Sequence, residues 1–210
     1  LPDGGASHFA AAITALKRES PRTTVEVLIP DFQGVEASLA IVAQARPHVV
    51  AHNIETVERL TPTVRDRRAK YAQSLRVLEY LKQRPERLYT KSSVMVGLGE
   101  TDAELEQTFK DLRGAGVDVL TLGQYLQPSQ FHLRVERFAS PEKFADDSLR
   151  SISHYATDEA NTPYDIYLVL KTGGGSKQAG LGNGIHWHIE NNVQYYASDE
   201  HDQEIPYVRV

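Results

Sequence analysis

The sequence has no cysteine among its 210 residues. Without thiols the chain cannot build a disulfide, a cysteine nucleophile, a thiolate zinc site or a cysteine-ligated iron–sulfur cluster from its own residues. It also lacks any apolar run near the ~18 residues of a membrane-spanning helix, so we expect no membrane insertion. Its net charge is only -5, and Lys and Arg are scattered among acidic residues, which predicts no nucleic-acid surface. These absences favour small molecules or proteins as partners.

Helical and strand patterns alternate through the first two thirds of the chain. Apolar residues at helical spacing precede short β-branched runs, and Pro21 and Pro47 each separate a helix from the next strand. A capping box at Thr101 predicts a helix that ends at Gly114 or Gly116. The predicted strands cover residues 25–29, 48–53, 90–96 and 117–122. This order predicts an α/β fold with parallel strands, in a barrel or a doubly wound sheet.

Polar residues follow these strands directly, at the end where barrel enzymes build their sites. They are Asp31, Asn53, Glu55, Glu100 and Gln124. Asn53 and Glu55 share one face of a strand end by the period of two, and this face could bind vicinal ribose hydroxyls. Capping of the following helix by Asn53 or Thr56 is an equally open interpretation.

A second motif, residues 93–100, is an apolar strand that runs into a glycine turn and closes on Glu100. Glycine at Gly97 would let a ligand approach the backbone closely. Glu100 would either hold the turn or meet a polar group of the ligand. A plain turn with Glu100 in solvent remains open as well.

Eight short segments extend these two motifs, in order, at residues 1–6, 30–32, 52–57, 64–65, 73–75, 95–100, 123–128 and 135–138. In order and spacing they resemble lipoyl synthase, a radical S-adenosylmethionine (SAM) enzyme, over residues 1 to about 145. The resemblance implies a partial (β/α)6 radical-SAM barrel with about four βα units, which supply the third to sixth strands. Residues 146–210 do not match and predict a divergent tail, either β-rich or disordered.

The resemblance also implies a reaction: radical insertion of sulfur at two unactivated carbons of a protein-bound octanoyl group, in lipoate biosynthesis. The cofactors would be SAM and 4Fe-4S clusters, and the partner an octanoylated lipoyl domain or H-protein. Because the cluster cysteines are absent, we expect the chain alone to be inactive. Family members work in bacterial cytoplasm, or in mitochondria or plastids. An incomplete barrel leaves an exposed edge, which predicts self-association.

The resemblance assigns no catalytic residue and no metal ligand, but it implies a set of SAM-binding residues. Arg65 would meet the SAM carboxylate through a charge-assisted hydrogen bond. Lys91 is a weaker candidate, with a solvent-exposed strand-end lysine as the alternative. The implied set comprises Asn53 and Glu55 at the ribose or methionine end, Arg65, then Ser93, Met95, Gly97 and Glu100 near adenine, with Gln124 and Leu126 beside them.

Other functions stay open. One is a non-catalytic SAM-binding or regulatory fragment. Another is a metal-dependent hydrolase that uses His186, His188 and Glu190, which alternate along a β-like run in the tail, although a solvent-facing polar stripe explains them too. Ser151 and Ser153 faintly resemble a serine that ligates the family's auxiliary cluster. Further tail strands are predicted at residues 164–170, 185–189 and 193–196.

Overall fold

The computed structural model of the protein describes residues 1–140, 143, 167–171, 186–190 and 192–196. Its α-helices are α1 (Ala6–Glu19), α2 (Glu36–Gln44), α3 (Thr61–Val64), α4 (Tyr71–Lys82) and α5 (Asp102–Gly114). Two short 3-10 helices, η1 (Phe32–Gly34) and η2 (Glu58–Leu60), follow the first two strands. The strands are β1 (Glu26–Leu28), β2 (Val49–Ala51), β3 (Tyr89–Val96), β4 (Val119–Gln124), β5 (Tyr167–Lys171), β6 (His186–Glu190) and β7 (Asn192–Tyr196).

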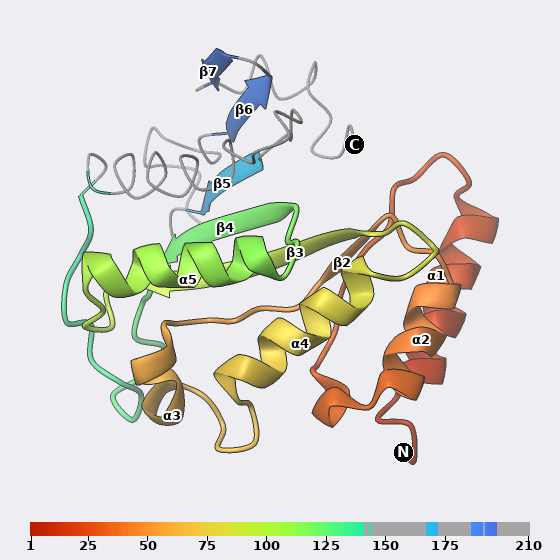
Figure 1. Ribbon diagram of the computed structural model, residues 1–210, viewed down its shortest axis with the longest axis horizontal. Helices are drawn as coiled ribbons and strands as arrows, with labels where there is room; N and C mark the ends of the chain where they lie inside the picture. The colour runs from red at the N-terminus through yellow and green to blue at the C-terminus, as the bar shows by residue number, and fades with distance from the viewer. Residues whose placement is uncertain (141–142, 144–166, 172–185, 191, 197–210) are drawn as a thin grey trace.

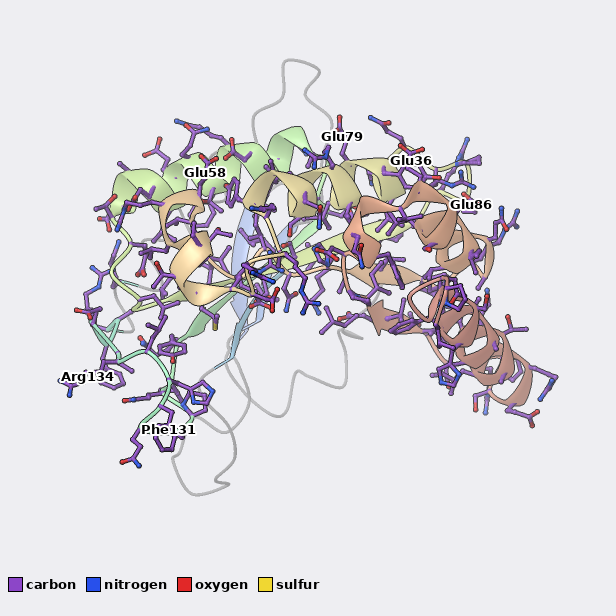
Figure 2. All side chains as sticks on the ribbon, turned by 90° about the horizontal axis from the view of Figure 1, so that it is seen from below. Glu36, Glu58, Glu79, Glu86, Phe131 and Arg134 are labelled. Atoms are coloured by element: carbon purple, nitrogen blue, oxygen red, sulfur yellow. The ribbon has the colours of Figure 1, made fainter. Side chains whose placement is uncertain are left out.

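The strands form one sheet in the order β1-β2-β3-β4-β5-β6-β7. Strands β1 to β4 pair in parallel, as the alternation of helices and strands predicted. Helices α2, α4 and α5 lie on the same face of this parallel part (Figures 1 and 2). A doubly wound sheet has helices on both faces, whereas in the described part of the chain these three helices lie on one face, as in a partial barrel wall. The predicted α/β fold class is confirmed.

The core lies between the sheet and these helices. One apolar cluster joins α1, α2 and α4 to β1 and β2, around Leu39 and Val50. A second joins α4 and α5 to β3 and β4, around Val94 and Phe109. Since side chains alternate along a strand, burial of Val94 under the helices directs its neighbours in β3 to the other face of the sheet.

Lys91 is on that other face, and its environment contradicts the interpretation of a solvent-exposed lysine at a strand end. Its ammonium lies 2.7 Å from a carboxylate oxygen of Glu26 in β1, so the ion pair spans strand β2. The Lys91 side chain is 10% exposed. It is therefore not a lysine in solvent, and its charge is compensated within the sheet, as a buried charge requires.

The boundaries of β1 to β4 agree with the sequence to within about two residues. The strand predicted over 48–53 is only Val49–Ala51, because pairing with β3 continues past His52 only as an isolated bridge at Glu55. The sequence reasoning did not predict α3 or the two 3-10 helices, which are too short to show a helical apolar period. Strand-like tail segments are confirmed as β5, β6 and β7, where β6 and β7 pair antiparallel.

Several predictions concern residues that the structure does not describe. Ser151 and Ser153 are outside the described residues, and so are the side chains of β6, which contains His186, His188 and Glu190. The hypothesis of a metal site in the tail, and the domain boundary near residue 145, therefore stay predictions. Across the described residues no helix is both long and apolar enough to cross a membrane.

The capping box of α5 gives the first test. Thr101 Oγ1 accepts from the Glu104 amide, and the Glu104 carboxylate accepts from the Thr101 amide at 2.8 Å. Thr101→Ala removes one of these partners, so we expect the free energy of unfolding to fall by about 1 kcal/mol. Urea denaturation followed by circular dichroism measures it. Thr63→Ala, on the exposed side of α3, is the matched control, and an equal loss in both variants would contradict the prediction.

Candidate functional site

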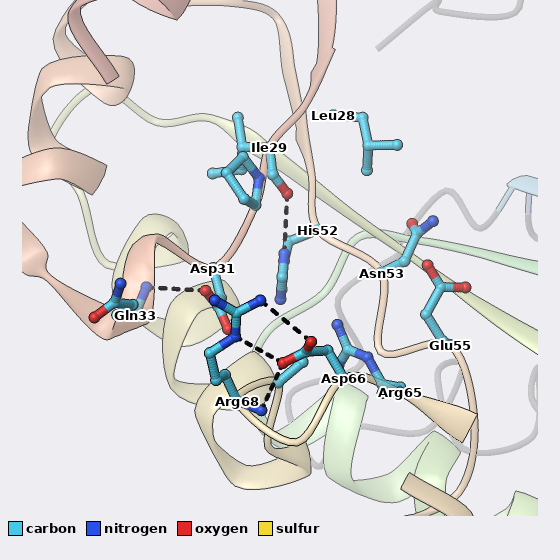
Figure 3. Close-up of a pocket in the computed structure, with 12 residues that line it drawn as sticks. Leu28, Ile29, Asp31, Gln33, His52, Asn53, Glu55, Arg65, Asp66 and Arg68 are labelled. Carbon is cyan, nitrogen blue, oxygen red and sulfur yellow. Dashed lines mark hydrogen bonds and ion pairs between the residues drawn. The ribbon is translucent and has the colours of Figure 1, made fainter. Parts of the chain in front are cut away.

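A cavity of about 500 Å³ opens at the carboxyl ends of β1 and β2 (Figure 3). Its volume is within the range of small-molecule sites. Most of the lining residues are polar, and they come from the end of β1, from the segments after β1 and β2 and from the loop between α3 and α4. The lining consists of Leu28, Ile29, Pro30, Asp31, Gln33, His52, Asn53, Glu55, Arg65, Asp66, Arg68 and Ala69.

Asn53 and Glu55 both line this cavity, but the geometry differs from a regular strand end. Strand β2 ends at Ala51, and Glu55 adopts a left-handed backbone with a φ of 67°. The Glu55 amide donates to Ser93 O at 2.9 Å, and Glu55 O accepts from the Met95 amide at 2.8 Å. These two bonds fasten the segment after β2 onto β3 and keep Glu55 at the cavity.

The capping interpretation of this segment is wrong. The next helix, η2, has Val57 at its N-cap and no side-chain cap. Thr56 is fully buried, and its hydroxyl has no hydrogen-bond partner among the described residues. Asn53 therefore does not cap a helix, and it lines the cavity.

Arg65 reaches the cavity from the loop after α3 and is linked to a buried histidine. Its Nη1 donates to Ser74 Oγ at 2.7 Å, and the same oxygen lies 3.0 Å from His52 Nε2. The other ring nitrogen of His52 lies 3.1 Å from Ile29 O. Burial is the main reason that the pKa of His52 is lowered, and the nearby Arg65 charge lowers it further.

The sequence reasoning did not select His52 or Ser74 as site residues. Both lie inside segments that carry the family resemblance, but spacing alone cannot reveal a contact between β2 and α4. Burial also lowers the pKa of Arg65, while the carboxylates of Glu55 and Asp31 oppose that shift. The guanidinium stays protonated at neutral pH.

Carboxylates complete the cavity. Asp31 accepts from the Gln33 amide at 2.9 Å and from Gln73 Nε2 at 2.6 Å, which fixes its side chain. At the rim Asp66 pairs with Arg68 at 2.8 Å, and this contact lowers the pKa of Asp66 to about 2. Asp31 lies on one side of the cavity, and Arg65 and Glu55 lie on the other (Figure 3).

The glycine turn after β3 forms a separate group at the same edge of the sheet. The Glu100 carboxylate accepts from the amides of Gly97 and Leu98 at 2.7 and 2.8 Å, and Arg137 lies 3.5 Å from it. Glu100 is 7% exposed. Of the two predicted roles, holding the turn is confirmed, and the interpretation of Glu100 as a solvated residue is wrong.

Gly97 does permit a close approach, but the neighbour is the protein itself. Its φ is 101°, and a Cβ there would collide with the Gln124 side chain and with Arg137 O. Gln124 in turn donates to Arg137 O at 3.1 Å and accepts from the Ala139 amide at 2.8 Å. The space beside Gly97 is therefore filled by the protein, and the Gln124 amide is hydrogen-bonded within the chain.

The structure thus divides the predicted set into parts. Asn53, Glu55 and Arg65 share the cavity. Ser93 and Met95 are half-buried and join it through the backbone of Glu55. The remaining four do not line the cavity: Gly97, Glu100, Gln124 and the half-exposed Leu126.

The cavity combines a guanidinium, carboxylates and an amide, which suits a ligand with a carboxylate, a cationic group and hydroxyls. The described residues include no group of three or more His, Asp or Glu placed to hold a metal. The whole sequence has no thiol for an iron–sulfur cluster.

Comparison with known families gives this geometry a context. The sequence model that describes the radical SAM superfamily matches residues 2–112 of this chain. The chain belongs to the radical SAM superfamily. The match spans β1 to β3 and most of α5, and therefore includes the whole cavity.

Within this superfamily, the chain is similar to curated proteins named lipoyl synthase. It is 83% identical over 143 residues to the lipoyl synthase of Myxococcus xanthus (strain DK1622), which covers 68% of this chain and 48% of the relative. The mitochondrial lipoyl synthase of Aedes aegypti is 58% identical over 144 residues, 69% of this chain and 37% of the relative. The matches fall in the first 145 or so residues, so the predicted resemblance is confirmed. The chain spans about half the length of the curated relatives it matches.

Among similar solved structures is the radical SAM methyltransferase TsrM from Kitasatospora setae, with cobalamin and a [4Fe-4S] cluster bound. It is 12% identical, with a TM-score of 0.42, and covers 55% of this chain and 24% of that one.

The buried His52 predicts how stability depends on pH. Unfolded histidine binds a proton near pH 6.5, whereas the lowered pKa keeps His52 neutral in the fold to lower pH. The unfolded state therefore gains protons first, and the free energy of unfolding falls as pH drops below about 6.5. We expect His52→Gln to show a smaller fall between pH 7.5 and 5.5 in urea denaturation. An unchanged pH dependence would contradict a neutral buried His52.

Proposed function

We propose that the cavity binds SAM, and that residues 1–145 are the SAM-binding part of a lipoyl synthase that acts in lipoate biosynthesis. The observation that carries the proposal is the convergence of Asn53, Glu55 and Arg65 in one cavity at the carboxyl ends of parallel strands. Membership of the superfamily and the similarity to named lipoyl synthases support it.

Each cavity residue suits one part of SAM. Arg65 can pair with the α-carboxylate, because a guanidinium binds carboxylates through charge-assisted hydrogen bonds. Asn53 and Glu55 can hydrogen-bond to the ribose hydroxyls. Asp31 lies on the side of the cavity opposite Arg65 (Figure 3), and its carboxylate is held in place by Gln73. Its negative charge favours the cationic sulfonium and ammonium groups of SAM.

When bound, SAM supplies the radical chemistry of the superfamily. The residues of this chain bind and orient it at the carboxyl edge of the sheet. They do not fit a 4Fe-4S cluster, because the sequence has no thiolate to ligate iron. We therefore propose that the chain is inactive by itself, and that a working enzyme takes cluster ligands from outside these 210 residues.

The remaining details of function are proposals of the same kind. An octanoylated lipoyl domain or H-protein is the proposed partner, and the similarity to named lipoyl synthases supports a protein-bound octanoyl substrate. The relatives include bacterial proteins and others named mitochondrial, which supports either compartment. A non-catalytic SAM-binding fragment would use the same cavity, and only activity of a cluster-loaded assembly distinguishes it. Residues 146–210 are proposed to be a divergent tail that adds strands β5 to β7 to the same sheet.

Titration of the 210-residue chain with SAM tests the cavity. Neutral hydrogen bonds net about 0.5–1.5 kcal/mol each, and the entropy of capture opposes them, so we expect a dissociation constant no tighter than roughly 0.1 mM. Asn53→Ala and Glu55→Ala should each weaken binding several-fold in calorimetry. Glu79→Ala, on the exposed face of α4 (Figure 2), is the control. Binding that is indifferent to both cavity substitutions would place the site elsewhere.

Reconstitution tests the cluster argument. After anaerobic incubation with iron and sulfide, we expect neither the absorbance nor the paramagnetic signal of a 4Fe-4S cluster, since iron–sulfur clusters are held by thiolates. A cysteine-bearing ferredoxin treated in parallel shows that the procedure works. A stoichiometric cluster on this chain would contradict the prediction.

A further inference from the structure

The hydrogen bonds around His52 determine where its proton resides. The carbonyl of Ile29 can only accept, so His52 Nδ1, at 3.1 Å, carries the hydrogen. In a neutral ring Nε2 is then an acceptor, and the Ser74 hydroxyl at 3.0 Å donates to it. The hydroxyl hydrogen is thereby committed to the histidine.

This commitment leaves the lone pairs of Ser74 Oγ for Arg65. Nη1 of the guanidinium donates to that oxygen at 2.7 Å. The bonds therefore run in one direction, from Arg65 through Ser74 and His52 to Ile29 O. A flexible arginine side chain is fixed at the cavity wall by a residue that is itself fixed by a buried ring.

Charges around the ring favour this arrangement. His52 is 3% exposed. Arg65 from the loop after α3 disfavours a second proton on the ring, and Asp31 beyond β1 opposes that effect more weakly. A doubly protonated His52 would donate to Ser74 Oγ beside Arg65, which would bring two cationic donors to one hydroxyl oxygen.

We propose that His52 is a positioning residue, which commits the Ser74 hydroxyl as an acceptor for Arg65 and so directs the guanidinium toward a ligand carboxylate in the cavity. The identity of that ligand as SAM rests on the proposed function. The chain of hydrogen bonds from Arg65 through Ser74 and His52 to Ile29 O, called the relay below, rests only on the contacts among these groups.

Two substitutions separate the roles of the two ring nitrogens of His52, Nδ1 at Ile29 O and Nε2 at Ser74 Oγ. In His52→Gln the side-chain carbonyl can take the place of Nε2 and accept from Ser74. In His52→Asn the side-chain amide can take the place of Nδ1 and donate to Ile29 O, but nothing accepts from Ser74. If His52 only anchored the strand end, the Asn variant would be the better tolerated one.

The measured quantity is carboxylate preference, the ratio of the dissociation constants of decarboxylated SAM and SAM in ligand-observed NMR titrations of the full chain. A charge-assisted bond predicts a ratio of about tenfold or more in the unmodified protein. We expect His52→Asn and Ser74→Ala each to reduce it roughly fivefold, and His52→Gln to retain it within about twofold.

His48→Asn is the matched control. His48 precedes β2 as His52 follows it, and its Nδ1 accepts from the Val25 amide at 2.9 Å, away from the cavity. The carboxylate preference should be unchanged in this variant. Retention of the preference in His52→Asn, or its loss in His52→Gln with an intact circular dichroism spectrum, would overturn the proposal.

A ligand-free measurement decides the relay even where SAM does not bind. Nitrogen-15 NMR should show the Nδ1–H tautomer of His52, together with slowed exchange of the Arg65 guanidinium protons. That slowing should persist in His52→Gln and disappear in His52→Asn. The Nε2–H tautomer, or equal exchange in both variants, would refute the relay. An intact relay without SAM binding would instead refute the proposed function.

Discussion

Two backbone hydrogen bonds between Glu55 and strand β3 hold the cavity in its shape. The chain leaves β2 at Ala51, and without an anchor the following segment would be an ordinary exposed loop. The bonds to Ser93 O and from the Met95 amide hold it against β3, the strand with which β2 already pairs. A left-handed backbone at Glu55 is the cost, since that conformation is unfavourable for a residue with a side chain. The anchored segment faces the polar residues beyond β1, and the space between them is the cavity.

The two predicted carboxylates show why position at a strand end does not by itself define a ligand contact. Glu100 is buried and accepts two amides of its own turn, so its lone pairs are largely occupied. Glu55 lines the cavity, and its charge opposes the burial that lowers the pKa of Arg65. A carboxylate satisfied by backbone amides stabilises a turn, and one beside a cavity can bind a ligand. The same reasoning separates Gln124, bonded to the segment after β4, from Asn53.

The face of the sheet away from the helices carries a different constraint. Lys91 and Glu26 compensate each other there, so this surface contains paired charge among apolar residues such as the exposed Leu28. Burial of an unpaired lysine would cost several kcal/mol, and the pairing avoids this. The face therefore shows both charged and apolar character, which suits the inner wall of a partial barrel better than the outside of a complete domain.

The sequence by itself determined the alternation of helices and strands, the parallel sheet, the capping box of α5 and the exclusion of cysteine-ligated clusters. Each depends on local patterns or on composition, such as apolar periodicity, proline positions and the pair of Thr101 and Glu104. Only the tertiary structure decided which polar residues meet. The Arg65–Ser74–His52 relay and the pair of Lys91 with Glu26 join elements separated by 9, 22 and 65 positions. No local pattern encodes such contacts, because they depend on strand register and helix packing, which are set by the whole core.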